Sequence, residues 1–205
     1  MSENIRKESV SGNPLSRAVI AEMLANNFKK LPDTDRNLFL YGPLYLAGNA
    51  ALAGLISNSL YRRALNVTQA AVASSLPMAV VPFLTAAALY NTVVCCPLLS
   101  GDLNCPTCAQ IRGALVGVVG AGVYPILLAL PLNLGLASRY NTAPLPEKGN
   151  VLRYSLDLSR PILRRMRAVF VLQAFFGTYL GSRHFGSYTK LAQITFGPDG
   201  EALKD

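Results

Sequence analysis

The distribution of charged residues is the feature of this sequence that most restricts its possible folds. Only 15% of the 205 residues are Asp, Glu, Lys or Arg, against about 25% in an average soluble domain. The charges are clustered, and four stretches that cover half of the chain contain none: 37–61, 64–101, 113–138 and 168–182. This pattern excludes an intrinsically disordered chain and argues against a soluble globular enzyme. It indicates a multi-pass membrane protein.

The uncharged stretches are long enough to place transmembrane helices. A hydrocarbon core of about 30 Å requires roughly 20 apolar residues in an α-helix, so the sequence predicts an all-α fold with four spans, at about 38–60, 70–94, 113–136 and 164–182. The fourth stretch has only 15 uncharged residues, and we expect the arginines before it to extend to the headgroups. The spans form one transmembrane domain over 38–184, between an N-terminal region, 1–37, and a short tail, 185–205.

The N-terminal region contains one further predicted helix, over 14–31. Its apolar residues recur on one face and its charged residues lie elsewhere, which is typical of an amphipathic helix. Such a helix can lie on the membrane surface or pack against the transmembrane bundle, and the pattern does not separate these alternatives. Glu3, Glu8 and Glu22 argue against a cleaved mitochondrial presequence, so we expect an internal targeting signal.

Small residues recur at four-residue spacing within the predicted spans, which lets helix backbones approach closely in lipid. The amides Asn49 and Asn133 lie in the same spans, where side-chain amides form hydrogen bonds between helices. We expect all of these residues to make helix-packing contacts or contacts with a partner. The small residues of the set are Ala50, Gly54, Gly113, Gly117, Gly177 and Gly181.

Four cysteines lie at or near the second predicted loop. Cys105 and Cys108 form a Cys-Pro-Thr-Cys motif, and Cys95 and Cys96 lie at the end of the second span. The spacing favours a structural disulfide or a pair of disulfides, which suits an oxidising compartment. A redox-active pair at a helix N-terminus, a zinc site and unpaired thiols are the alternatives. The βαβ pattern typical of redox CxxC motifs is absent, and adjacent cysteines are poorly spaced for zinc.

The sequence offers few groups for catalysis. The predicted spans contain no Asp or Glu, which argues against proton pumps and ion exchangers. His184 is the single histidine, and its position just past the fourth span is typical of an interfacial residue rather than a general base. No phosphate-binding, metalloprotease or hydrolase motif is present. We therefore expect a protein that is not an enzyme and has no catalytic residue, cofactor or metal site.

A cluster of arginines overlaps the start of the fourth predicted span: Arg160, Arg164, Arg165 and Arg167. We expect it to bind anionic lipid headgroups, such as those of cardiolipin, or a partner; a role only as a determinant of topology is an equal alternative. Of the net charge of +8, a share of +7 lies on the loop at 61–69 and on 137–167. The positive-inside rule places these segments on the cytoplasmic side or its topological equivalent. No nucleic-acid-binding motif accompanies the arginines, and we expect no nucleic-acid partner.

Five segments of the chain resemble the transmembrane protein 126 family. They read GNAALAGLISNSLYRRALNVT at 48–68, LPMAVVPFLT at 76–85, GDLNCPTC at 101–108, YPILLALPLN at 124–133 and RYNTAPLPEKG at 139–149. The resemblance covers residues 30–190. The CxxC loop and the SNSLYRR stretch are more similar to the A-type branch of the family than to the B-type branch.

The resemblance implies a multi-pass protein of the mitochondrial inner membrane that helps to assemble respiratory complex I. For the A-type branch it implies work on the distal membrane arm around the ND4 subunit, with links to other assembly factors and the inner-membrane insertase. The termini and the CxxC loop would then lie in the intermembrane space, and the loops at 61–69 and 137–163 in the matrix. That space permits disulfides, which favours a Cys105–Cys108 bond or a pairing with Cys95 or Cys96. The resemblance implies no catalytic residue.

The residues and the resemblance together predict a chaperone-like scaffold. Its small-residue faces and intramembrane amides would bind newly inserted, unassembled membrane subunits of complex I. The alternative is a small-solute transporter or channel in the inner membrane, which requires a polar pore between the helices. A thiol-redox relay built on the CxxC motif is the third hypothesis.

Overall fold

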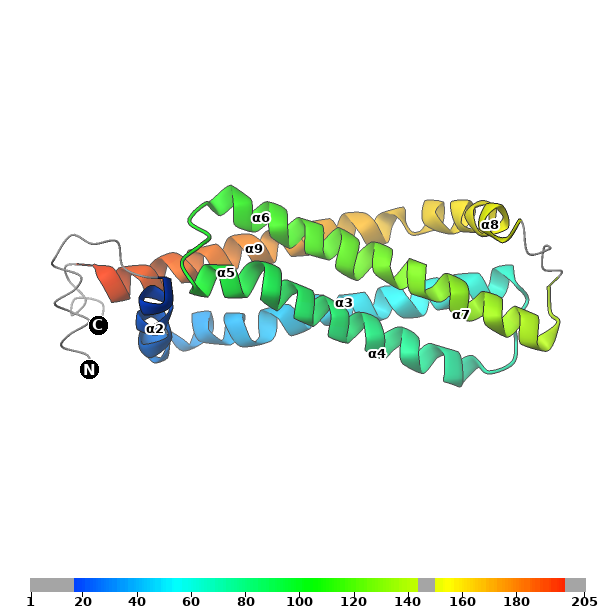
Figure 1. Ribbon diagram of the computed structural model, residues 1–205, viewed down its shortest axis with the longest axis horizontal. Helices are drawn as coiled ribbons and strands as arrows, with labels where there is room; N and C mark the ends of the chain where they lie inside the picture. Colours follow the sequence, from blue (N-terminus) through cyan, green and yellow to red (C-terminus); the bar gives the residue numbers. More distant parts are fainter. Residues whose placement is uncertain (1–16, 144–149, 198–205) are drawn as a thin grey trace.

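The computed structural model describes residues 17–143 and 150–197, and these residues form helices and no strand. Four long helical rods lie side by side in an elongated bundle (Figure 1). The first rod is α3, Asp33–Ala64, and the last is α9, Arg167–Phe196. The second consists of α4 (Ala71–Tyr90), a π-helical segment (Asn91–Cys95) and α5 (Cys96–Leu99). The third consists of α6 (Pro106–Leu115), a π-helical segment (Val116–Val123) and α7 (Tyr124–Tyr140).

Two shorter helices lie at opposite ends of the bundle (Figure 1). α2, Arg17–Asn27, lies near the α5–α6 loop at 100–105. We call this end of the bundle the cysteine end. α8, Val151–Arg165, lies near the α3–α4 turn at 65–70. We call this end of the bundle the basic end. Successive rods run in opposite directions, so the described loops divide between the two ends as the sequence predicts. The compartment that each end faces stays a prediction.

The lengths and compositions of the rods fit a membrane protein. Among the described residues, three helices are long and apolar enough to cross a bilayer: Asp33–Ala64, Ala71–Leu99 and Pro106–Tyr140. This confirms the prediction of an all-α membrane protein. α9 has 30 residues but is not one of these three helices. Four complete spans therefore stay a prediction.

The fourth predicted span, 164–182, differs from the observed helix at both ends. Met166 leaves helical geometry with φ −85° and ψ 2°, so α8 ends at Arg165 and α9 begins one residue after the break. α9 then continues to Phe196, through much of the predicted tail. Arg183 ended the uncharged stretch without ending the helix, because arginine is a good helix former and its side chain is exposed here.

The third predicted loop, 137–163, is partly helical. α7 continues to Tyr140, and α8 occupies the second half of the predicted loop. In α8, Ser155, Ser159 and Ile162 are buried against the bundle, at the spacing of one helix face. The prediction of a loop was wrong for this segment. The sequence has many arginines here, and they drew attention away from the helical spacing of its buried residues.

α2 packs against the bundle. The helix predicted at 14–31 begins in residues that lie outside the described part of the chain, and it ends in a 3-10 turn at Phe28–Lys30. Leu24 and Leu31 are buried in one apolar cluster with residues of α5 and α9. The sequence left open whether this segment lies on the membrane surface or packs against the bundle. In the structure it packs against the bundle.

Each of the two π-helical segments, whose turns are wider than those of an α-helix, ends shortly before a proline. Pro97 and Pro125 have no N–H to donate to the carbonyl four residues earlier, and a proline ring clashes with that carbonyl in a regular α-helix. A wider turn relieves the clash. The Val93 carbonyl, four residues before Pro97, instead accepts a hydrogen bond of 3.3 Å from Arg112 Nη1. Pro97 and Pro125 thus follow the two π-helical segments, whereas Pro77, Pro82 and Pro131 lie within regular α-helix in the same rods.

Candidate functional site

Glycines bring α6 and the following π-helical segment into backbone contact with α9. A Cβ built on Gly113 would collide with the carbonyl oxygen of Gly177, and one built on Gly177 would collide with that of Gly113. Gly117 and Gly181 meet backbone carbonyls of the facing helix in the same way. The four glycines thus contact one another's helices, and no side chain fits between the two backbones.

The small residues of α3 also face the inside of the bundle. A Cβ on Gly54 would collide with the Met78 carbonyl oxygen of α4. Ala50 is fully buried in a cluster with Ala86 of α4 and Ala121 of the third rod. The structure therefore places the predicted small-residue set in contacts within this chain, where it is not accessible to a partner.

A chain of buried amides and hydroxyls links three rods near the basic end. Asn133 Nδ2 of α7 donates to Asn58 Oδ1 of α3 at 2.9 Å and to the carbonyl oxygen of Ala129 at 2.8 Å. Asn58 Nδ2 donates to Ser74 Oγ of α4 at 3.2 Å, and Arg62 Nη1 donates to the same oxygen at 2.9 Å. The predicted residue Asn133 is therefore a helix-packing amide.

Asn49, the other predicted amide, lies in a different part of the bundle. Its Nδ2 is buried and has no hydrogen-bond partner among the described residues, and the same holds for Oε1 of Gln173. Gly42 faces Leu180, and Tyr45 contacts Phe176. Continuing this antiparallel register places Asn49 and Gln173 on neighbouring turns of α3 and α9.

We expect Asn133→Ala to lower the free energy of unfolding by about 1.5 kcal/mol, because it leaves Asn58 Oδ1 without its interhelical donor. Asn91→Ala is the matched control. Asn91 also donates to a carbonyl four residues earlier, but it is exposed. The control should change the free energy of unfolding by less than about 0.5 kcal/mol. SDS-induced unfolding of the purified protein, followed by circular dichroism, measures both; equal losses would contradict the interhelical role.

A cavity of about 540 Å³ opens beside this network, between the end of α3 and the start of α4. Its lining residues include Arg62 and Arg63 and the polar residues Asn58 and Ser75. Arg62 is held in place by a second hydrogen bond, from Nη2 to the Thr68 carbonyl oxygen at 2.9 Å. Two cations beside uncharged polar groups suit an anionic group better than a cation.

His184 is a core residue at the cysteine end, which corrects the prediction of an interfacial position. The ring is fully buried where α3, α4 and α9 meet. Its Nε2 lies 3.1 Å from the Leu38 carbonyl oxygen, and its Nδ1 lies 3.0 Å from the Tyr90 hydroxyl. Gly42 makes room for the ring, since a Cβ there would lie 2.7 Å from His184 Cε1. The histidine therefore joins three rods.

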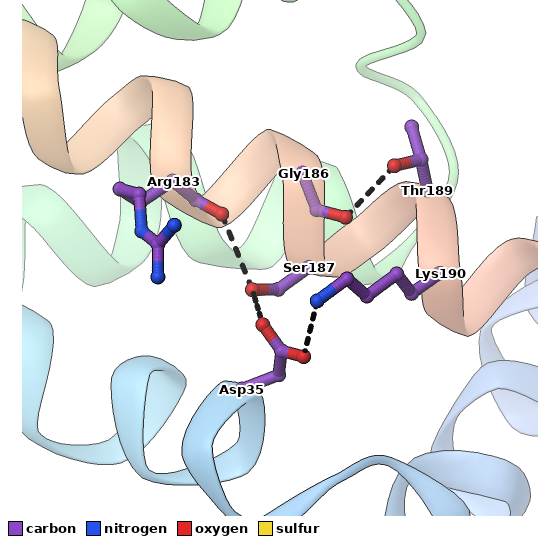
Figure 2. Close-up of polar contacts among 6 residues, drawn as sticks. All are labelled: Asp35, Arg183, Gly186, Ser187, Thr189 and Lys190. Atoms are coloured by element: carbon purple, nitrogen blue, oxygen red, sulfur yellow. Dashed lines mark hydrogen bonds and ion pairs between the residues drawn. The ribbon is translucent and has the colours of Figure 1, made fainter.

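Asp35 ties the first turn of α3 to the last turns of α9 at the cysteine end (Figure 2). Ser187 Oγ donates to Asp35 Oδ1 at 2.6 Å, and Lys190 Nζ forms an ion pair with Asp35 Oδ2 at 2.8 Å. The carboxylate side chain is only 7% exposed, whereas the lysine side chain is 57% exposed. The ion pair thus has one buried member, and α9 supplies both groups that compensate its charge.

The four predicted cysteines lie at the cysteine end as thiols. Cys95 is buried, and Cys96 and Cys108 are exposed. Cys105 is the N-cap residue of α6, and its Sγ accepts a hydrogen bond from the Cys108 N–H at 3.3 Å. Hydrogen bonds from the Cys108 side chain and backbone lower the pKa of the Cys105 thiol. The disulfide pairing stays a prediction, and among the described residues no group of three or more His, Cys, Asp or Glu could hold a metal ion.

The predicted arginine cluster lies at the basic end, on the last turns of α8 and the first residue of α9. Arg160, Arg164, Arg165 and Arg167 all have exposed side chains. Arg160 forms an exposed ion pair of 3.3 Å with Asp157, and Arg167 Nε donates to the Arg164 carbonyl oxygen. These side chains are accessible to a headgroup or a partner, and their role in docking stays a prediction.

Sequence reasoning missed two residues that join the rods: Asp35 and Arg112. Asp35 was outside the predicted first span, and its partners lie more than 150 residues away in the sequence. Arg112 had a usable signal, because Pro97 predicts a carbonyl without a helical partner and an arginine follows at the start of the next rod. The amide of Asn58, by contrast, predicts an interhelical hydrogen bond, and the structure has one to Asn133.

Comparisons with known proteins place the chain among membrane proteins of one family. The family described as transmembrane protein 126 matches residues 18–197. Transmembrane protein 126A of Mus musculus is 53% identical over 86% of this chain and 90% of its own length. Transmembrane protein 126A of Homo sapiens is 46% identical over 84% of this chain and 88% of its own length.

A more distant relative carries a functional name. Complex I assembly factor TMEM126B, mitochondrial, of Homo sapiens is 29% identical over 91% of this chain and 80% of its own length. No solved structure matches the chain. The match to the family spans the four rods described above, including the glycine crossing, the buried amides and the CxxC motif. The chain therefore belongs to the transmembrane protein 126 family.

Proposed function

We propose that the chain is an assembly factor for respiratory complex I and acts as a chaperone-like scaffold in the mitochondrial inner membrane. The observation that carries the proposal is its similarity, over 91% of its length, to a relative named as a mitochondrial complex I assembly factor. Three helices able to cross a bilayer support a membrane-embedded role. The chain is more similar to the A-type relatives, and we further propose what the resemblance to that branch implies: work on the distal membrane arm around ND4, with other assembly factors and the insertase as partners.

The surface we propose for the client is the aromatic face between α3 and α9. Tyr41, Tyr45 and Tyr179 are each more than half exposed, and they line a groove of about 330 Å³ whose lining is mostly apolar. Aromatic side chains provide large contact areas with little loss of conformational entropy, and they dominate the energetics of many interfaces. We propose that a transmembrane helix of an unassembled complex I subunit occupies this groove. The small-residue faces are buried within the bundle, so a client cannot reach them.

The basic end supports a second contact, with anionic lipid. The exposed arginines of α8 and α9 lie at the same end of the bundle as the cavity that Arg62 and Arg63 line. Guanidinium groups near a membrane surface attract anionic headgroups, such as those of cardiolipin. With the positive-inside rule, we propose that this end faces the matrix and that the cysteine end faces the intermembrane space.

The packing of the bundle supports a scaffold over a channel. Backbone contacts at Gly54, Gly113 and Gly177 close the space between neighbouring rods. The buried alanine cluster fills the interior between α3, α4 and the third rod. The buried polar groups mostly bond to each other, which uses them for packing rather than for a solute path. We further propose that the chain is not an enzyme.

The double variant Tyr41→Ala, Tyr179→Ala is expected to recover at least fivefold less unassembled complex I subunit than the unchanged chain, because it removes two aromatic walls of the groove. Affinity purification from solubilised mitochondria with quantitative mass spectrometry measures the recovery. The matched control is Leu84→Ala, Leu127→Ala. These side chains are equally exposed apolar residues on α4 and α7, away from the groove.

Two outcomes would overturn these proposals. If the unchanged chain recovers no complex I subunit or assembly factor, the assembly role is wrong. If it recovers them and the groove and control variants recover equal amounts, the assembly role stands and the groove is not the client surface. Normalising recovery to the level of each variant removes effects of misfolding.

A further inference from the structure

The CxxC motif occupies one turn at the start of the third rod. Cys105 has an extended backbone, with φ −112° and ψ 121°, and Pro106 follows it as the first helical residue. Proline is favoured at this position because its fixed φ suits a helix and the missing N–H would be unpaired there. The Cys105 sulfur faces back over the first turn, where it accepts the Cys108 N–H at 3.3 Å.

A bond between these two cysteines cannot act as a structural crosslink. A disulfide stabilises a fold by closing a loop of the unfolded chain, and its effect grows with loop length. Cys105 and Cys108 enclose only two residues and lie on the same helical turn, so their bond joins no second element. By contrast, Asp35 and Lys190 join two rods at this end without either of these cysteines.

The surroundings of the pair favour exchange with another thiol. Cys108 is exposed and Cys105 is partly exposed, so a reactant can approach from solvent. The positive end of the helix dipole and the Cys108 N–H that Cys105 Sγ accepts stabilise a thiolate at Cys105. The buried thiol of Cys95 has neither access nor a donor of this kind.

We propose that Cys105 and Cys108 form a thiol–disulfide exchange site, with Cys105 as the attacking thiol and Cys108 as the resolving thiol. The co-reactant is a disulfide, either of a small thiol such as glutathione or of a protein. This inference does not rest on the proposed assembly function.

The exchange balances in two steps. The Cys105 thiolate attacks one sulfur of the incoming disulfide, forms a mixed disulfide and releases the other sulfur as a thiolate, which takes up a proton. Cys108 then loses its proton to solvent and attacks Cys105 Sγ, which forms the Cys105–Cys108 bond and releases the second thiol. Two electrons pass from the pair of cysteines to the incoming disulfide, which leaves as two thiols.

Glutathione redox buffers test the proposal on the full-length protein in detergent. We expect Cys105 and Cys108 to convert together to an internal disulfide as the buffer becomes more oxidising, and to return to thiols in the reducing buffer. Alkylation with a mass-tagged maleimide and peptide mapping detects both states. At neutral pH, Cys105 of the reduced protein should react with maleimide about tenfold faster than Cys96, which is exposed but has no such hydrogen bond.

Single variants separate the two roles. Cys108→Ala should accumulate a mixed disulfide between Cys105 and glutathione, because the resolving thiol is missing. Cys105→Ser should abolish both species and still fold, since serine is a strong N-cap residue. Cys96→Ser is the control and should behave as the unchanged chain.

Three results would overturn the proposal: no mixed disulfide in Cys108→Ala, a bond from Cys105 to Cys95 or Cys96 in the oxidised protein, or a Cys105–Cys108 bond that resists the reducing buffer. A parallel incubation of Cys108→Ala with mitochondrial extract identifies the source of the disulfide. A glutathione adduct indicates a small-thiol reactant, and a crosslinked protein indicates a protein reactant.

Discussion

Gly177→Ala is expected to lower the free energy of unfolding by about 3 kcal/mol, because the space between the two helices does not accommodate a methyl group at this position. Its Cβ would collide with the backbone oxygen of Gly113 and lie 3.2 Å from Ala114 Cα. Backbone atoms cannot move aside as a side chain can. The two helices must therefore separate, and contacts are lost along the crossing. SDS-induced unfolding of the purified protein, followed by circular dichroism, measures the change.

Gly186→Ala is the matched control for this prediction. Gly186 lies on the same helix, and a Cβ built on it meets nothing within 4 Å. Alanine is the better helix former by about 1 kcal/mol, so the control should be neutral or slightly stabilising. Equal destabilisation by the two variants would mean that the crossing in the membrane is looser than the structure has it.

Asp35→Ala is expected to lower the free energy of unfolding by about 2 kcal/mol. The substitution removes the closer of the two acceptors of the Ser187 hydroxyl, leaving the Arg183 carbonyl oxygen at 3.2 Å, and it removes the carboxylate that pairs with Lys190 (Figure 2). Water can solvate the released lysine, because that side chain is 57% exposed, so most of the loss comes from the buried hydrogen bond. We also expect faster hydrogen exchange in the first turns of α3, where the tether to α9 is lost.

Asp33→Ala controls for the effect of charge at a helix N-terminus. Both aspartates lie in the first turn of α3, but Asp33 is 80% exposed and pairs with Arg36 of the same helix, at 2.7 Å. An exposed pair of this kind contributes about 0–1 kcal/mol. If both variants lose the same stability, Asp35 acts through the helix dipole and not through α9.

The predictions from sequence succeeded where composition alone carries the information. Uncharged stretches as long as 64–101 must bury themselves in lipid or in protein, and this fixed the helical class and three of the predicted spans. The fourth predicted span was too short for the same reason: it ends before Arg183, a charged residue that the helix tolerates on its exposed face. The helical period of α8 was present in the sequence and was hidden by its arginines.

For the candidate sites as well, the sequence predicted a local feature and left its neighbour or its chemistry open. The spacing of Gly113 and Gly117 predicted close packing, but the sequence left open whether the neighbour was a partner or another helix of this chain. The structure gives that neighbour as α9. For the CxxC motif, the spacing left four chemistries open. Its location on a single helical turn removes the role of a structural crosslink for a bond between Cys105 and Cys108.

Local patterns in the sequence were enough to predict a bundle of membrane helices, which loops share an end and where small residues permit close approach. These properties depend on local composition and on the period of a helix. The contacts of His184 with three rods and of Asp35 with Ser187 and Lys190 became visible in the folded bundle alone. Each of these polar groups needs a partner once it leaves water, and the chain supplies that partner from a helix far away in the sequence. Such pairings follow from how whole helices pack, and no local pattern encodes them.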